Sequence, residues 1–355
     1  MQVVAGVDCH QDTHSIVFLN FAGQLQKQLL IETTAEGYRQ AVEAAAEFQE
    51  VQWGLESTGC YGSAFAKHLV EAGAIVFEVP GAFTKRHRKR ASQSGKSDPL
   101  DAKAIAEAVL RESDRLPRFE WSVEREAIRL RYDQRDRLVR ERTKHINRLR
   151  NAALRLDLRS LPADLSCVGA LEQVRIAAQA LQGKDAAVDA LVDEILFTVE
   201  DIMLTIQRVK NIEVLLRPLL RRVAPELLAM HGVSTVIAAG LIGHAGNLRN
   251  IRDAGAFAMR CGVAPISWSS GRSSAVRINT GGNRQLNRLL HLAALSQIRS
   301  KTHSGRVYYD RKRAEGKTHR GAMRALKRQL CTVVYYRLRS CAAALRPDRS
   351  EPIAA

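Results

Sequence analysis

The N-terminal third of the chain alternates short apolar segments with polar turns. Five of these segments are rich enough in Val, Ile and Leu to predict strands: Val3–Val7, Thr13–Leu19, Gln26–Ile31, Val51–Glu56 and Ala74–Val79. Two other segments, residues 35–49 and Gly62–Glu71, have the composition of helices. Three strands in succession, followed by alternating strand and helix, favour an α/β domain with a mixed sheet of the ribonuclease-H type over a purely parallel sheet.

The middle of the chain carries two long stretches with apolar residues at heptad spacing, which predicts an antiparallel coiled-coil hairpin. The first helix is expected from about Val123 to Leu158 and the second from about Ala186 to Leu216. The apolar seams are Ile128, Tyr132, Val139, Ile146, Leu149, Ala153 and Leu156 in the first helix, and Val188, Ile195, Ile202, Val209 and Leu216, with Leu191, Ile212 and Leu219 beside them, in the second. Pro218 is expected to kink or end the second helix. The hairpin forms either within one chain or as a dimerisation arm between subunits, and spacing alone does not separate these alternatives.

The last third of the chain is expected to be mainly helical. Residues 230–240, with Gly232 near their start, resemble the hairpin of a helix–hairpin–helix module, whose backbone N–H groups bind a phosphate; an ordinary pair of packed helices would have a similar sequence. The serine-rich segment from Gly262 to Ser274 predicts a flexible loop. These patterns divide the chain into residues 1–115, 116–225, 226–346 and a tail, 347–355.

The charge of the chain indicates a polyanionic partner. The formal net charge is +17, from 54 Lys and Arg against 37 Asp and Glu. Residues 1–115 contain 12 Lys and Arg against 15 Asp and Glu, a net charge of −3, so the remainder of the chain carries +20. The segment 299–328 alone has 11 Lys and Arg, with Tyr308 and Tyr309 among them, which is typical of a surface that binds a nucleic-acid backbone. Nucleic acid is therefore the predicted partner, ahead of a merely solvated basic surface.

Cysteine spacing and hydropathy exclude several other classes. The 6 cysteines show no CxxC spacing, which argues against a zinc site or a disulfide framework. No uncharged apolar stretch is long enough to span a bilayer, and the chain enters its first predicted strand without the pattern of a signal peptide. We therefore expect a cytoplasmic protein with reduced thiols and no membrane partner.

Four carboxylates lie where one divalent cation could bind them together. Asp8 and Glu56 interrupt or close predicted strands, where solvation is poor, and Asp98 and Asp101 lie at a predicted helix start with Pro99 in its first position. Acids gathered on one side of a sheet bind Mg²⁺ or Mn²⁺, the ions that activate phosphodiester chemistry. Each acid alone is also explained as a helix cap or a turn residue. Their order and context favour a metal-dependent, nuclease-like centre.

Two groups of polar and basic residues are predicted to bind nucleic acid. The first group, in a charged loop before Asp98, is Lys85, Arg86, Arg88, Lys89, Arg90 and Lys96, and the second, after the serine-rich segment begins, is Arg272, Arg277, Asn283 and Arg284. The first group is too charged to pack in a core, and beside an acidic centre it would hold a phosphate backbone. A serine hydroxyl among the cations of the second group could attack a phosphate.

Taken in order, these motifs resemble the DEDD transposases of the insertion-sequence one-ten family, relatives of the Piv DNA invertases. The resemblance covers nearly the whole chain and rests on Gly6-Val7-Asp8, Leu55-Glu56-Ser57-Thr58-Gly59, Lys96-Ser97-Asp98 with Asp101, the central coiled coil, and the segment from Gly262-Val263-Ala264-Pro265 through Ser269-Ser270-Gly271 to Gly282-Asn283-Arg284. The ordered combination is specific, whereas any single piece is weak.

The resemblance implies a RuvC-like N-terminal domain whose catalytic, metal-binding acids are Asp8, Glu56, Asp98 and Asp101. It also implies a C-terminal transposase domain in which Ser270, adjacent to Ser269, forms a phosphoserine with DNA. A structured bridge RNA that pairs with donor and target DNA, and dimers that assemble into tetramers, are further implications. Cys9 and His10, beside Asp8, are interpreted as structural residues or as supports of the metal ligands.

Two rival functions are compatible with the same motifs. A RuvC-like hydrolytic endonuclease would use the metal and water, and its serine-rich segment would be a linker. A non-catalytic nucleic-acid-binding protein would have lost the metal site. The presence of all four acids and of the Ser-Ser-Gly segment counts against the second rival.

Overall fold

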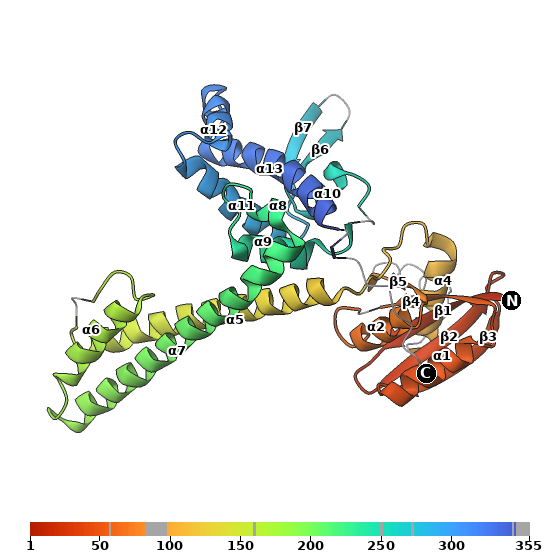
Figure 1. Ribbon diagram of the computed structural model, residues 1–355, viewed down its shortest axis with the longest axis horizontal. Helices are drawn as coiled ribbons and strands as arrows, with labels where there is room; N and C mark the ends of the chain where they lie inside the picture. Colours follow the sequence, from red (N-terminus) through yellow and green to blue (C-terminus); the bar gives the residue numbers. More distant parts are fainter. Residues whose placement is uncertain are drawn as a thin grey trace. The chain divides into compact units, whose positions relative to one another are not determined.

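The structure is a computed structural model that describes residues 1–56, 58–81, 98–158, 161–248, 251–270, 273–342 and 344–345, with the backbone alone for residues 268–270 and 273–276. It divides into two compact units (Figure 1). The first is built on Met1–Ser122, and the second on Val123–Gly246 together with Asp253–Leu345. The finer division of the chain into four parts stays a prediction.

The first unit contains a five-stranded mixed sheet with the strand order β3-β2-β1-β4-β5. Its strands are β1 (Gln2–Cys9), β2 (Thr13–Asn20), β3 (Leu25–Glu32), β4 (Glu50–Leu55) and β5 (Ile75–Glu78), and its helices are α1 (Ala35–Ala45), α2 (Ser63–Glu71) and α4 (Asp98–Glu112). β2 is antiparallel to β1 and β3, whereas β4 is parallel to β1 and β5. The predicted mixed sheet is confirmed, with the strand directions expected for the ribonuclease-H type.

The residues of β1 alternate between two cores because successive side chains of a strand point to opposite faces. Val3 and Val7 belong to the cluster that includes Phe65 of α2, whereas Val4 belongs to the cluster that includes Ile105 of α4. Gly6 follows Val4 on the α4 face. A Cβ on Gly6 would overlap the backbone of α4 at Ala102 and Ala106, so glycine at position 6 lets the helix lie directly on the strand.

The second unit is mainly helical, as predicted. Its helices are α5 (Val123–Arg155), α6 (Val168–Gln179), α7 (Ala186–Val223), α8 (Pro225–Leu228), α9 (Thr235–Ala245), α10 (Ala254–Arg260), α11 (Arg284–Arg299), α12 (Ser304–Ala314) and α13 (His319–Cys341), and its strands are β6 (Pro265–Ser270) and β7 (Ser273–Ile278). None of the helices in the described part of the chain is both long and apolar enough to cross a membrane.

The helices α5 and α7 form a long antiparallel pair within one chain (Figure 1). The ion pairs Arg222–Glu124 and Arg135–Glu213 and a contact of His145 with Asp201 join them in antiparallel order. The heptad positions Ile195, Ile202, Val209 and Leu216 of α7 are buried, as the seam predicts. The intramolecular hairpin is therefore present, while its supercoiling and any role between subunits stay predictions.

The helix α7 does not end at Pro218, which lies inside it, but continues to Val223. Proline removes the N–H that would bond the carbonyl of Val214, four residues earlier. Pro218 and Val214 are both exposed, so water can reach that carbonyl and its lost partner costs little. This exposure is why α7 extends beyond the expected end at Leu216.

The expected loop in the serine-rich segment is wrong for residues 265–270 and 273–274, which lie in strands. β6 and β7 form an antiparallel hairpin in which Pro265 pairs with Ile278 and Ser270 pairs with Ser273. The strands contain Ile266, Val276 and Ile278 beside their serines, and β-branched apolar residues of this kind favour strands. We call β6 and β7 the serine hairpin.

The segment expected to resemble a helix–hairpin–helix comprises the connection after α8 and the first part of α9. Ser234 caps α9 through its hydroxyl, which accepts from the N–H of Ile237, and Gly232 has a positive φ of 86°. A Cβ on Gly232 would lie 2.7 Å from the carbonyl oxygen of Ala293 in α11. Packing against α11 thus accounts for this glycine, and phosphate binding here stays a prediction.

Candidate active site

Two of the predicted acids come from neighbouring parallel strands. Val7 of β1 pairs with Leu55 of β4. The next residues along the chain, Asp8 and Glu56, therefore lie at the same level, at the carboxyl ends of the two strands. Asp8 lies two residues beyond Gly6 and therefore points to the face that α4 covers. This explains how a residue in an apolar strand meets the acids of α4.

The first turn of α4 completes an acidic cluster. It carries Asp98 and Asp101, of which Asp101 is buried and Asp98 is exposed. Nε2 of His10 lies 3.2 Å from Oδ2 of Asp8 and 3.3 Å from Oδ1 of Asp98. One ligand atom from each of Asp8, His10 and Asp98 lies within 4.8 Å of the others, which is close enough for all three to bind one ion.

The electrostatics of Asp8 fit a cation at this point. Burial raises the pKa of the Asp8 carboxyl, and the charges of Asp101 and Asp98 raise it further, while His10 opposes the shift. Asp101 and Asp98 are thus near enough to act on Asp8. A bound cation favours the charged form of a carboxyl, so it would offset both the burial and the repulsion between the acids.

Glu56 lies at the same edge but is not one of the three clustered residues. A Cβ on Gly81 would lie 2.8 Å from Oε1 of Glu56, so the carboxylate rests against the backbone at Gly81. The charges of Asp8 and Glu56 both contribute to a raised pKa of the Cys9 thiol, after burial. Glu56 therefore lies within electrostatic reach of the site, and its role as a ligand stays a prediction.

His10 is expected from the sequence to be structural or to support the metal ligands. The structure places its ring between Asp8 and Asp98, where it can support the two carboxylates or bind the ion itself. A site made of carboxylates and an imidazole suits Mn²⁺ better than Mg²⁺, because Mg²⁺ prefers oxygen ligands to an imidazole nitrogen. The signal available in the sequence was an imidazole two residues after a strand-end acid, in the turn before β2.

The base of the serine hairpin is held by asparagines spaced four residues apart. Nδ2 of Asn279 donates to the carbonyl of Met259 at 3.2 Å, and the backbone N–H of Asn283 donates to the carbonyl of Arg260 at 2.6 Å. The side chain of Asn283 also caps α11 by accepting from two backbone N–H groups. The end of β7 and the start of α11 are thereby fixed to the turn that precedes β6.

Asn287 extends the same clamp by one turn of α11. Its Nδ2 donates to the carbonyls of Cys261 and Gly262 at 2.9 and 3.0 Å, and its Oδ1 accepts from Nζ of Lys327 at 2.8 Å. The four successive carbonyls of residues 259–262 therefore all have donors from the segment 279–287. We call this set of contacts the asparagine clamp.

Two family models match this chain in the regions that carry these sites. One, described as a transposase model for DEDD proteins of the IS110 group, matches residues 5–156, and the other, described as the transposase IS116/IS110/IS902 family, matches residues 224–310. The first contains all four predicted acids and the second contains the serine hairpin. The chain belongs to the IS110 family of DNA transposases.

Relatives of this transposase include proteins that match most of its length. A protein of insertion element IS116 from Streptomyces clavuligerus is 25% identical over 95% of both chains. The transposase of insertion sequence element IS1328 from Yersinia enterocolitica is 28% identical over 70% of this chain and 72% of its own. Among solved structures, T. thermophilus RuvC in complex with a Holliday junction substrate is 15% identical, covering 34% of this chain and 100% of its own, with a TM-score of 0.29, a likeness too weak to bear on the fold.

The predicted nucleic-acid-binding residues of the transposase are only partly described. Lys85, Arg86, Arg88, Lys89, Arg90, Lys96 and Arg272 lie outside the described residues, as does the expected charged loop. Arg277 and Arg284 are exposed, and Asn283 has the structural role of a helix cap. Ser270 ends β6, where the structure describes its backbone alone.

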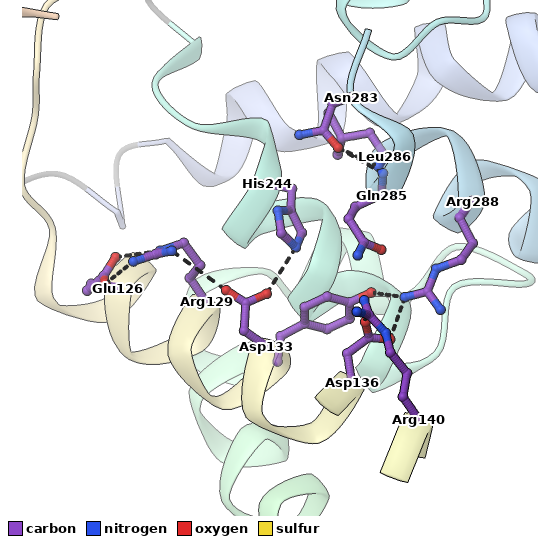
Figure 2. Close-up of polar contacts among 11 residues, drawn as sticks. Glu126, Arg129, Asp133, Asp136, Arg140, His244, Asn283, Gln285, Leu286 and Arg288 are labelled. Atoms are coloured by element: carbon purple, nitrogen blue, oxygen red, sulfur yellow. Dashed lines mark hydrogen bonds and ion pairs between the residues drawn. The ribbon is translucent and has the colours of Figure 1, made fainter. Parts of the chain in front are cut away.

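A polar network fixes α11 of the transposase to α5 (Figure 2). Nη2 of Arg288 donates to the hydroxyl of Tyr132 at 2.9 Å and to Oδ1 of Asp136 at 2.6 Å, and Arg140 pairs with the same buried carboxylate. Although burial opposes the change, the hydrogen bonds and charges of Arg288 and Arg140 lower the pKa of Asp136. This network anchors the helix that carries the asparagine clamp.

The network continues along α5 to the end of α9. Nε2 of His244 lies 3.3 Å from Oδ1 of Asp133, and Arg129 joins Asp133 to Glu126 (Figure 2). Burial lowers the pKa of His244, although the charge of Asp133 opposes that shift. These residues had no predicted role. Because they link helices and do not reach the serine hairpin in the described contacts, we assign them to the scaffold.

Proposed function

We propose that this transposase cuts and rejoins DNA through a covalent ester between DNA and Ser270, with Mg²⁺ or Mn²⁺ bound by Asp8, Glu56, Asp98 and Asp101. The observation that carries the metal part is the meeting of Asp8, His10 and Asp98 within 4.8 Å, with Asp101 close enough to raise the pKa of Asp8. A bound divalent ion would polarise a phosphate and neutralise charge that develops on it.

The residues of the acidic centre have distinct tasks in this proposal. Asp8 and Asp98 offer oxygen donors from a strand end and a helix start, and the position of each is set by packing of α4 on β1. Asp101 is buried, so its carboxylate adds negative charge without competing water around it. Glu56 enters from β4, and His10 contributes an imidazole that orients the carboxylates or binds the ion itself.

The serine part of the proposal is supported by the asparagine clamp. The hydroxyl oxygen of Ser270 attacks a DNA phosphorus, the new Ser–O–P ester forms, and the bond from phosphorus to one DNA oxygen breaks to release a hydroxyl end. A hydroxyl end of a second strand reverses the step and frees the serine. Such exchange conserves the ester, so no nucleotide hydrolysis is needed, and a fixed hairpin base would present the serine reproducibly.

The nucleic-acid partners in this proposal are donor DNA, target DNA and a structured bridge RNA that pairs with both. Binding is assigned to Lys85, Arg86, Arg88, Lys89, Arg90, Lys96, Arg272, Arg277, Asn283 and Arg284. The net charge of +17 supports the assignment. We further propose a cytoplasmic homodimer that assembles into a tetramer, with the α5–α7 hairpin as the arm between subunits.

The deciding experiment looks for a protein–DNA adduct that survives denaturation. The purified full-length protein is incubated with Mg²⁺, DNA of its element ends and RNA transcribed from the flanking non-coding region. Ser270→Ala should abolish the adduct, while Ser267→Ala, on the same strand, should leave it intact. Ser269→Ala tests the adjacent hydroxyl, and Asp101→Ala tests the metal centre.

The outcomes separate the proposal from its nearest rival. An adduct that is lost only in Ser270→Ala and weakened in Asp101→Ala supports the phosphoserine. Free nicked DNA without an adduct, lost in Asp101→Ala and retained in Ser270→Ala, would make the protein a hydrolytic endonuclease. Binding without any cleavage would leave a non-catalytic nucleic-acid-binding protein.

A further inference from the structure

A group of cations lies where α11 and α13 pack together, beside the asparagine clamp. Arg284 comes from α11, and Arg324 and Lys327 come from successive turns of α13. Nζ of Lys327 donates to Oδ1 of Asn287, whose Nδ2 holds the carbonyls of Cys261 and Gly262. A single side chain therefore separates this cationic group from the turn that starts β6.

The cations of this group have no acidic partner within the described part of the chain. Among the residues that the structure describes, none of Arg284, Arg324 and Lys327 forms an ion pair with a carboxylate. By contrast, Nζ of Lys312 in α12 lies 2.7 Å from Oε2 of Glu315. Unmatched charges held close together are costly, and an anion bound between them would relieve the repulsion.

The electrostatics of the neighbouring groups point the same way. Burial lowers the pKa of Lys327, and the charges of Arg324 and Arg284 lower it further. Burial also lowers the pKa of His291, which is likewise part of α11, and the charges of Lys327 and His319 lower it further. The local potential is therefore positive, and it is produced by side chains from two helices.

Lys327, Arg284 and Arg324 have N–H donors available for an anion. An ammonium group has three N–H donors, and Asn287 accepts one from Lys327. Arg284 and Arg324 are exposed, so an incoming anion can reach their guanidinium groups. Phosphate oxygens are the acceptors that such a combination of lysine and arginine matches best in nucleic acid.

We propose that Lys327, Arg324 and Arg284 bind one backbone phosphate of a nucleic acid next to the serine hairpin. The proposal rests on the proposed function, because it assigns a further phosphate contact to the nucleic acid bound beside the serine hairpin. Because Asn287 contacts both Lys327 and the carbonyls of Cys261 and Gly262, a phosphate bound at this site would affect the position of the turn just before the hairpin. Lys327 is thus a positioning residue and does not touch the reacting atoms.

The test measures how binding by the full-length protein depends on salt. The probes are a short DNA duplex of arbitrary sequence and an RNA duplex of the same sequence. Loss of one phosphate contact reduces the slope of log affinity against log salt concentration by about one. Lys327→Met and Arg324→Gln should each show this reduction, while Lys327→Arg should keep the slope of the parent.

The matched control is Lys312→Met, which removes the same charge from a lysine already paired with Glu315. Its slope should equal that of the parent. Arg324 is exposed, so Arg324→Gln is expected to fold even if Lys327→Met does not, and thermal unfolding checks each variant. A reduced slope with the DNA probe assigns the phosphate to DNA, and a reduced slope with the RNA probe alone assigns it to RNA.

Unchanged slopes in Lys327→Met and Arg324→Gln with both probes would overturn this inference, as would an equal reduction in Lys312→Met. Failure of the proposed function looks different, since it is read from the Ser270-dependent adduct of the parent protein. Slopes that fall as expected without any such adduct would retain the phosphate site and remove the serine chemistry. An adduct with unchanged slopes would retain the serine chemistry and remove the phosphate site.

Discussion

Nε2 of His10 lies 3.2 Å from Oδ2 of Asp8, and it also lies 3.3 Å from Oδ1 of Asp98. The imidazole thereby joins the end of β1 to the first turn of α4. A group in that position either donates to a bound ion or orients the carboxylates that do, and loss of such a group commonly weakens metal binding about 10- to 100-fold.

His10→Ala is therefore expected to weaken Mn²⁺ binding by about 10-fold or more, as measured by calorimetric titration of the full-length protein. His68→Ala, a histidine of α2 outside the cluster, is the control and should bind as the parent does. Tighter binding by His10→Ala would show instead that the imidazole competes with the ion for the carboxylates.

Gly6→Ala is expected to destabilise the first unit by about 3 kcal/mol, because the added Cβ overlaps the backbone of α4. Displacing α4 also moves Asp98 and Asp101 away from Asp8, so Mn²⁺ affinity should fall together with stability. Urea unfolding and metal titration measure the two effects. Gly59→Ala is the control, since no atom lies within 4 Å of a Cβ at that position; equal stability of the two variants would contradict the close packing.

Asp136→Asn is expected to cost about 2 kcal/mol in the free energy of unfolding, since it weakens the charged hydrogen bonds from Arg288 and Arg140. The pKa of Asp136 is lower in the folded state, so its stabilisation is fully present above the unfolded pKa and is lost as pH falls through the folded pKa. The difference between parent and variant should therefore shrink in acid.

Chemical denaturation at neutral and acidic pH checks this prediction. Asp310→Asn removes an exposed partner of Arg306 in α12 and should cost less than about 1 kcal/mol. A difference between parent and Asp136→Asn that grows as pH falls would be inconsistent with a lowered pKa.

Asn287→Ala is expected to reduce formation of the serine–DNA adduct more than it reduces DNA affinity. The substitution removes the donors to Cys261 and Gly262 and the acceptor for Lys327, while it leaves Ser270 in place. Stability should fall by about 1 to 2 kcal/mol. Asn211→Ala, which loses one exposed hydrogen bond with Gln207 on α7, is the control. Full adduct formation by Asn287→Ala would remove the clamp from the mechanism.

The sheet of the first unit was predictable because both of its faces are covered, so β1 is a continuous apolar run from Val3 to Val7 apart from one glycine. The two long helices were predictable from buried heptad residues such as Ile195 and Ile202. In both cases the buried side chains are large, and their spacing reports directly on the element.

The serine hairpin was not predictable by the same reasoning. Its strands carry serines at the ends that face each other and mostly apolar residues elsewhere, and the contacts that hold its base come from Asn279 and Asn287, outside the strands. The contact of His10 with Asp98 was not predictable for a related reason, because it exists only once α4 lies on β1.

Backbone crowding at two glycines changes how variation among relatives should be read. A side chain at position 6 would collide with α4, and one at position 282, where φ is 82°, would lie 2.7 Å from the carbonyl oxygen of Arg260. Both positions are therefore expected to stay glycine in every relative that keeps this fold, whatever residues that relative has in the acidic cluster.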